Sequence, residues 1–200
     1  TLIEIINLTS LDKVKGDNWT CEVQAFDGTD YETDSNNGTK IVIQNVAPET
    51  ASITLNATDH PNNYTTANLT CYANITDADA DQVYANFTWY WNNTINSTGQ
   101  SGPFTTSILS EVSIMGSENT TRDDNWTCEV LPWDETDYST SYTNSTTLII
   151  QNTAPTASAV TIISDDSQNR TNGTLTGSWT YADDDNDLHS DNQTQWYNNT

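Results

Sequence analysis

The chain has 200 residues, with 28 Asp and Glu against only 5 Lys and Arg, and its formal net charge is −23. This charge argues against a nucleic acid or an anionic membrane surface as a partner, because both are bound mainly through Lys and Arg. No apolar run approaches the ~18 residues of a membrane helix. Seven Trp, nine Tyr and regularly spaced aliphatic runs indicate a folded core rather than disorder.

An internal repeat organises the chain. The string Asp17–Val23 recurs as Asp124–Val130, and Gln44–Pro48 is matched by Gln151–Pro155 at the same offset. A repeat of about 107 residues is the size of one β-sandwich domain. The repeat predicts three parts: the C-terminal half of a module over 1–46, a complete module over 47–153, and the N-terminal half of a module over 154–200.

The predicted elements are all strands. Thr1–Leu8 aligns with Ile108–Met115, so residues 1–46 are expected to hold the fifth to seventh strands of a module. Strands rich in Val, Ile, Thr and aromatic residues are expected near 50–56, 67–75, 84–92, 105–115, 124–132 and 143–151, with a short edge strand near 96–100. Clusters of Gly, Asn, Asp and Pro separate them. Residues 154–200 are expected to hold the first three strands, the third over 192–200.

Apolar residues alternate along these strands. Leu69, Cys71, Ala73 and Ile75 share one face of their strand, and by the same parity Trp89, Trp91 and Trp126 point to the core. Six or seven such strands predict a β-sandwich.

Asn-x-Ser/Thr triplets are about three times as frequent as the Asn and Ser/Thr content would produce by chance. Such a triplet is an N-glycosylation acceptor of secreted proteins. Alternation places several of these Asn opposite the apolar face, so we expect heavy glycosylation of the surface. The acceptors are Asn7, Asn18, Asn37, Asn56, Asn63, Asn68, Asn74, Asn86, Asn92, Asn96, Asn119, Asn125, Asn144, Asn169, Asn172, Asn192 and Asn198.

The segment around Cys128 carries a family resemblance. Its Asp-x-Asn-Trp-Thr-Cys-Glu-Val resembles the Asp-x-x-x-Tyr-x-Cys-x-Val of immunoglobulin-like domains, with Trp126 in place of the corner Tyr. The whole pattern is similar to the tandem immunoglobulin-like or cadherin-like (PKD-like) repeats of archaeal and bacterial cell-surface glycoproteins. The resemblance implies an all-β fold of tandem immunoglobulin-like sandwiches with a Cys71–Cys128 disulfide packed against a Trp. A disulfide in turn implies an oxidising, extracellular location, and two buried free thiols are the alternative.

Acidic loops are the candidate metal sites. Carboxylates at alternate positions can converge on Ca²⁺, a hard cation that takes 6–8 oxygen ligands. The acidic loop lies between the second and third strands of a module, and in a sandwich it shares a pole with the hairpin between the last two strands. That pole faces the preceding module, so a cation bound there would clamp adjacent modules. A solvated acidic loop is the alternative. The candidate ligands are Asp77, Asp79 and Asp81, the matching Asp183, Asp185 and Asp187, and Asp134 and Asp137 of the hairpin.

We expect a structural role rather than catalysis. The two histidines, His60 and His189, do not match between repeats, and no nucleophile or phosphate-binding motif is present. The expected partners are copies of the chain, or neighbouring modules of one long chain, joined head to tail into a filament, stalk or surface layer. The spacer of a large adhesin is one alternative, and a carbohydrate-binding accessory module that uses Tyr72, Tyr90 or Trp133 is another.

Cys21 is unpaired in this scheme. The position that aligns with Cys71 in the last module is Gly177 or Ser178, so closure of that module by another copy would leave Cys21 without a disulfide partner. We expect Cys21 to pair with a residue outside this sequence.

Overall fold

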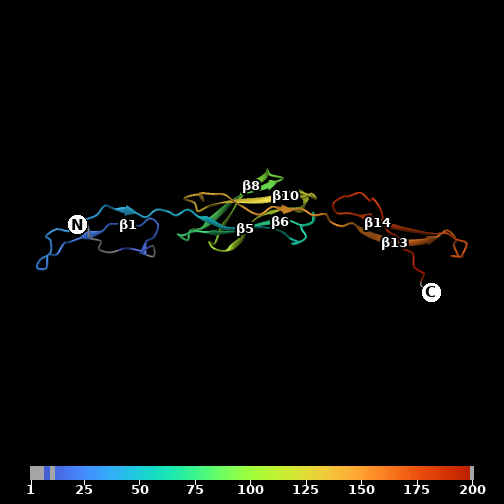
Figure 1. Ribbon diagram of the computed structural model, residues 1–200, viewed down its shortest axis with the longest axis horizontal. Coiled ribbons are helices and arrows are strands. Elements are labelled where there is room, and N and C mark those ends of the chain that lie inside the picture. Colours follow the sequence, from blue (N-terminus) through green and yellow to red (C-terminus); the bar gives the residue numbers. More distant parts are fainter. Residues whose placement is uncertain (1–6, 10–11, 199–200) are drawn as a thin grey trace.

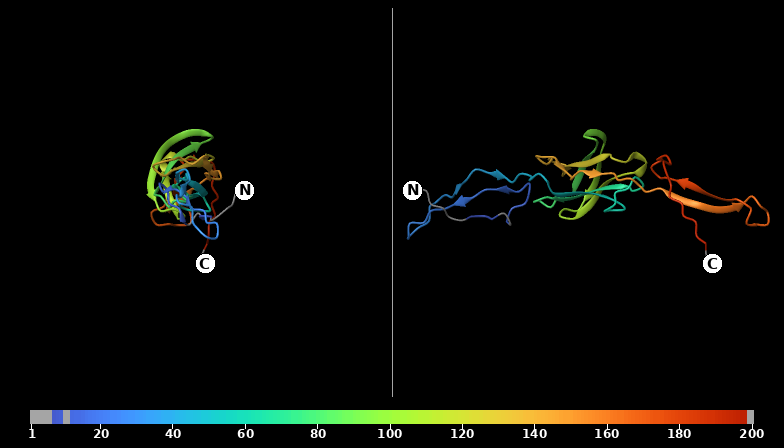
Figure 2. Two further views of the ribbon diagram at one scale, coloured as in Figure 1. Left: turned by 90° about the vertical axis from the view of Figure 1, so that its left-hand side faces the viewer. Right: turned by 45° about the vertical axis from the view of Figure 1, so that its right-hand side comes forward.

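The computed structural model describes residues 7–9 and 12–198, which form an all-β chain. Three parts lie in a row along the long axis of the molecule (Figures 1 and 2). Most of the aligned segment Thr1–Leu8 lies outside the described residues. Over the described part of the chain, no helix is long and apolar enough to cross a membrane.

The N-terminal part consists of two short antiparallel pairs. Strand β1 pairs with β4, and β2 pairs with β3. The strands are β1 (Asn18–Trp19), β2 (Glu22–Val23), β3 (Asn36–Asn37) and β4 (Ile41–Val42).

The central part contains two antiparallel sheets. One has the order β5-β6-β9, and the other has the order β11-β10-β7-β8, with β12 also paired to β10. The strands are β5 (Glu49–Ala57), β6 (Leu69–Thr76), β7 (Val83–Trp91), β8 (Thr94–Phe104), β9 (Leu109–Met115), β10 (Asn125–Trp133), β11 (Thr143–Asn144) and β12 (Leu148–Ile149), and a short 3-10 helix, η2 (Ser117–Asn119), follows β9. Both sheets contribute to one core, an arrangement compatible with a β-sandwich.

The predicted alternation is confirmed in this core. On β6 the apolar set Leu69, Cys71, Ala73 and Ile75 is buried, as expected for one face of a strand. Burying such side chains on two facing sheets removes apolar surface from water, which is the main favourable term of folding.

A disulfide joins the two sheets. Cys71 of β6 and Cys128 of β10 are bonded, as predicted. Trp89 and Trp126 are buried in the same core and meet edge to face, with 6.1 Å between their ring centroids. Trp89 Nε1 donates a hydrogen bond to Ser113 Oγ at 3.0 Å, whereas Trp126 Nε1 has no hydrogen-bond partner among the described residues.

Several predicted details are wrong. The edge strand expected at 96–100 is the longer β8, and the strand expected over 143–151 is split into β11 and β12. Trp91, expected in the core, is 43% exposed because it lies at the very end of β7.

The C-terminal part repeats the first hairpin of the central part. β13 (Thr156–Ser164) pairs with β14 (Leu175–Ala182), and Ile162 lies opposite Gly177 as Leu55 lies opposite Cys71. The third strand expected over 192–200 does not form over 192–198. Its counterpart β7 is held between β8 and β10, and a strand without such neighbours has no partner for its backbone groups.

Removal of the disulfide is expected to destabilise the central part. Replacing both Cys71 and Cys128 with Ala should lower the free energy of unfolding by about 4 kcal/mol, because the bond closes a long loop in the unfolded chain. Urea unfolding followed by Trp fluorescence measures this loss. The Cys21→Ala variant is the control, since Cys21 is exposed and unbonded. Equal unfolding midpoints for both variants would contradict the expectation.

Candidate site at the module junctions

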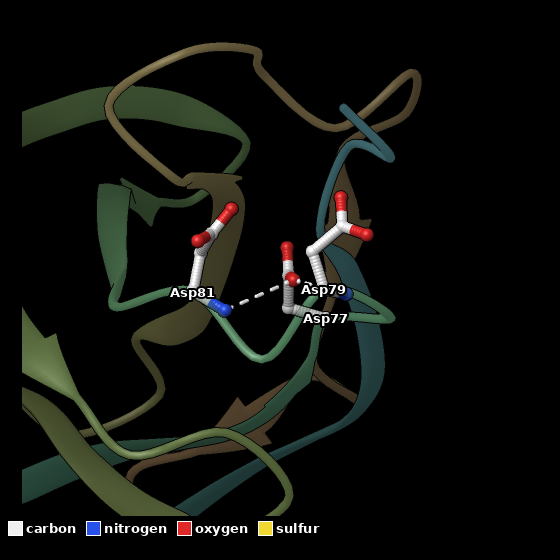
Figure 3. Close-up of side chains that lie close together, drawn as sticks. All are labelled: Asp77, Asp79 and Asp81. Atoms are coloured by element: carbon white, nitrogen blue, oxygen red, sulfur yellow. Dashed lines mark hydrogen bonds between the residues drawn. The ribbon is translucent and has the colours of Figure 1, made fainter. Parts of the chain in front are cut away.

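The first acidic loop, between β6 and β7, is organised by its own first carboxylate. Asp77 Oδ1 accepts hydrogen bonds from the backbone N–H groups of Asp79, at 2.8 Å, and Asp81, at 3.2 Å. This is the local turn that Asp side chains favour, and Ala80 completes it with a positive φ of 59°. The three carboxylates project from the loop toward the same side (Figure 3).

The second acidic loop, after β14, has the same geometry. Asp183 Oδ1 accepts from the N–H groups of Asp185, at 2.9 Å, and Asp187, at 3.0 Å. Asn186 has a φ of 61°, close to that of Ala80. The same residue types at the same spacing therefore build the same loop twice.

A basic side chain from the preceding part reaches each loop. At the first junction the Lys15 ammonium donates hydrogen bonds to Asp81 and, at 2.9 Å, to Asn45 Oδ1. The backbone N–H of Val46 in the linker donates to Asp79 Oδ2 at 2.8 Å. The linker is thus bonded to the loop by its own backbone as well as by a side chain.

The hairpin between β10 and β11 takes part in the same junction. The Asn45 amide donates to Asp134 Oδ2 at 2.8 Å and to Asp137 Oδ2 at 2.9 Å. Asp134 is buried, and its Oδ1 accepts from the N–H groups of Thr136 and Asp137, which fixes the hairpin turn. The sequence prediction that the hairpin and the loop share a pole that faces the linker is therefore confirmed.

The second junction reproduces the first. Arg122 Nη1 donates to Asp187 and, at 2.6 Å, to Asn152 Oδ1. The N–H of Thr153 donates to Asp185 Oδ2 at 2.7 Å. Thr65 adds a hydroxyl hydrogen bond to Asp185. Five interacting groups are the same in kind at both junctions: a basic side chain, a linker Asn, a linker N–H and two loop carboxylates.

The electrostatics keep this network charged near neutral pH. The hydrogen bond to Asp81, aided by the nearby carboxylates, raises the pKa of Lys15 above its usual value. Burial alone would raise the pKa of Asp134, but hydrogen bonds from Asn45 and the hairpin backbone outweigh it and lower the pKa. Both groups therefore hold their charges across the physiological range.

Each loop also has the donor set of a hard cation. Carboxylate oxygens of Asp77, Asp79 and Asp81 lie within 4.8 Å of one another, and the three equivalents in the second loop do the same. Asp77 Oδ2 and Asp183 Oδ2 are both buried, and neither accepts a hydrogen bond from the described residues. The structure thus brings each predicted triad together, and it places Asp134 and Asp137 against the linker through Asn45.

Sequence reasoning missed four residues of the junctions: Lys15, Arg122, Asn45 and Asn152. A signal for them was present, since each pair is separated by the repeat offset. Two basic residues at matching positions in a chain with only five are a notable coincidence. The sequence could not show which groups Lys15 and Arg122 bond, because the paired carboxylates lie more than sixty residues further along the chain.

The predicted glycosylation acceptors lie on the surface. Four of them, Asn56, Asn63, Asn74 and Asn86, are half-buried, and the other thirteen are exposed. Glycosylation itself stays a prediction.

Surface aromatic residues close the hairpins. Trp133 stacks on Tyr138 with 5.8 Å between ring centroids, and the matching pair Phe26 and Tyr31 lies at 4.6 Å. Because both pairs bridge the two sides of a hairpin, cross-strand packing accounts for them. Tyr90, the second sugar-binding candidate, donates to Glu129 Oε1.

No known protein family matches the chain, and no curated protein is significantly similar to it.

The basic side chains are expected to fix the angle between the parts. The Lys15→Met, Arg122→Met variant should broaden the distribution of maximum dimensions in small-angle X-ray scattering, because each junction loses the counter-charge to its loop. The melting temperature of the central part should change by no more than about 2 °C, since exposed pairs add little stability. Lys13→Met is the control, because Lys13 is exposed and lies just outside the junction. A scattering profile equal to that of the control would show that the pairs are dispensable.

Proposed function

We propose that this chain is a stretch of tandem immunoglobulin-like modules in a structural extracellular glycoprotein. The modules are joined head to tail into a cell-surface filament, stalk or surface layer. The role is mechanical and non-catalytic: to hold a fixed direction over a long distance. The stalk of a large adhesin would need the same property.

The duplicated junction carries this proposal. Flexible linkers between modules need no specific contacts, whereas here two linkers share a matching group of hydrogen bonds, and each junction has an ion pair to the same loop position. The same joint repeated along a chain gives each module the same orientation to the next. Repetition of one joint is what an extended, regular assembly requires.

The immunoglobulin-like assignment rests on strand order and on the core. The sheets β5-β6-β9 and β11-β10-β7-β8 are linked by a disulfide between β6 and β10, with Trp89 of β7 beside it. This arrangement resembles that of immunoglobulin-type sandwiches, which supports the assignment. The disulfide and the surface position of the acceptor Asn residues support an extracellular, N-glycosylated protein.

Imaging of the native protein tests the proposal. Electron micrographs should show straight rods with a regular module spacing, and enzymatic or chemical deglycosylation should lower the intact mass. Glycopeptide mass spectrometry would assign the occupied Asn residues. Modules joined at random angles would refute the mechanical role, and an unchanged mass would refute the glycoprotein assignment.

We also propose Ca²⁺ as a ligand of the acidic loops, where it would add to the counter-charge supplied by Lys15 and Arg122. Ca²⁺ should then raise the melting temperature and narrow the distribution of dimensions in scattering, and Mg²⁺ should do so less. Asp77→Asn combined with Asp183→Asn should abolish the response, because it removes one carboxylate from each triad. Glu111→Gln, at an exposed position on β9, is the matched control. An identical response in both variants would exclude the loop as the binding site.

A further inference from the structure

An aromatic residue stands two positions before five of the seventeen glycosylation acceptors. Aromatic residues make up 10% of the chain, so about two acceptors would have one there by chance. In all five cases the third residue of the triplet is Thr. This excess points to a role for the ring beside the acceptor. The pairs are Tyr72 and Asn74, Tyr84 and Asn86, Tyr90 and Asn92, Tyr142 and Asn144, and Trp196 and Asn198.

Two of these pairs lie within long strands, on the outer faces of the two central sheets. Tyr72 and Asn74 belong to β6, and Tyr84 and Asn86 belong to β7. All four residues are half-buried, whereas the residue between each Tyr and its Asn is buried in the core. Residues two apart on a strand share one face and lie about 6–7 Å apart. Each ring therefore lies beside the point where a glycan would be attached.

The amide of Asn86 is turned toward β10. Its Oδ1 accepts a hydrogen bond from Gln100 Nε2 of β8 at 3.1 Å, and its Nδ2 donates to the backbone carbonyl of Leu131 on β10 at 3.4 Å. A glycan is attached to Nδ2, and the amide keeps one N–H after attachment. The glycan therefore leaves the strand on its β10 side.

Three aromatic rings form a strip on that side. In the register of β7 and β10, Trp133 lies directly opposite Tyr84. Trp133 is therefore a diagonal neighbour of Asn86, a position within reach across a sheet. The ring centroids of Tyr84 and Trp133 are 5.5 Å apart, those of Trp133 and Tyr138 are 5.8 Å apart, and Tyr138 is 54% exposed. The strip thus begins beside the acceptor and continues away from it.

The amide of Asn74 has an oxygen without a partner. Its Oδ1 is buried and accepts no hydrogen bond from the described residues, which is an unfavourable state for a polar atom. Because the oxygen is turned inward, the same amide presents Nδ2 outward. A sugar attached there would bring hydroxyl groups close enough to donate to Oδ1.

We propose that the glycan on Asn86 packs on the rings of Tyr84 and Trp133. The glycan on Asn74 packs on Tyr72 in the same way. The C–H groups of a sugar ring form an apolar face, and packing this face on an aromatic ring removes apolar surface of both from water. The inference rests on the proposed glycoprotein function and deepens it, because it makes the ligand of the aromatic strip the carbohydrate of the chain itself and makes that carbohydrate part of the folded structure.

A double-mutant cycle on the glycosylated protein from its native host tests the contact. Tyr84→Thr should lower the melting temperature of the central part by about 4 °C more in the glycosylated chain than in the Asn86→Gln background, because only the former loses sugar packing. The hydrogen bond from Tyr84 to Glu135 and its contact with Trp133 are lost in both backgrounds and cancel. Equal effects in the two backgrounds would overturn the inference.

Asn96→Gln is the matched control for Asn86→Gln. Asn96 is an acceptor on β8 of the same sheet, and the residue two positions before it is Thr94. Tyr84→Thr should therefore have the same effect with and without Asn96→Gln. A cycle of Tyr72→Thr with Asn74→Gln should show the same coupling as the cycle on β7.

Proton NMR gives a readout that does not depend on stability. Protons of the first sugar on Asn86 should be shifted upfield by the ring currents of the aromatic strip, and Tyr84→Thr should reduce the shift. The sugar on Asn96 serves as the reference, because no aromatic residue stands two positions before it. Equal chemical shifts for the two sugars in the wild-type chain would contradict the contact.

Glycopeptide mass spectrometry separates a failure of this inference from a failure of the proposed function. Glycans at other acceptors, with Asn74 and Asn86 unmodified, would overturn the inference and leave the glycoprotein proposal standing. An unmodified chain would refute both. Binding of array oligosaccharides to the glycosylated chain that Trp133→Ala abolishes would show that the strip serves an external ligand, which would also overturn the inference.

Discussion

At each junction a basic side chain from one part of the chain forms an ion pair with the acidic loop of the next part. The chain carries 28 acidic residues and only 5 basic ones, and two of those five, Lys15 and Arg122, occupy the same position at the two junctions. Like charges close together cost energy in proportion to their proximity, and an interposed cation reverses the sign of the interaction. We expect the orientation of one part of the chain to the next to depend on this arrangement.

The junction is built from the inside outward. Asp77 and Asp183 each accept hydrogen bonds from the backbone of their own loop through one oxygen, and these bonds hold the other carboxylates in position. The linker then presents a backbone N–H and an Asn side chain at fixed points. Because the contacts involve backbone groups as well as charges, the linker conformation itself is constrained, and salt alone would not free it.

Local features of the central part could be predicted from the sequence because they have a local cause. Alternation of apolar residues placed β5, β6, β7 and β10 within one or two residues of their observed ends, and the disulfide followed from the resemblance. Features that depend on neighbours could not be predicted. Residues 192–198 carry a strand-like sequence but form no strand, since no described strand pairs with them as β8 and β10 pair with β7.

The sequence by itself determined the repeat, the strand pattern, the surface position of the glycosylation acceptors and the turn chemistry of the acidic loops. Each of these is encoded by residues a few positions apart, where spacing maps directly onto geometry. Only the tertiary structure decided which side chains form hydrogen bonds and ion pairs with the acidic loops. The pairing of Lys15 with Asp81, and of Arg122 with Asp187, joins residues whose separation in sequence has no geometric meaning until both parts have folded.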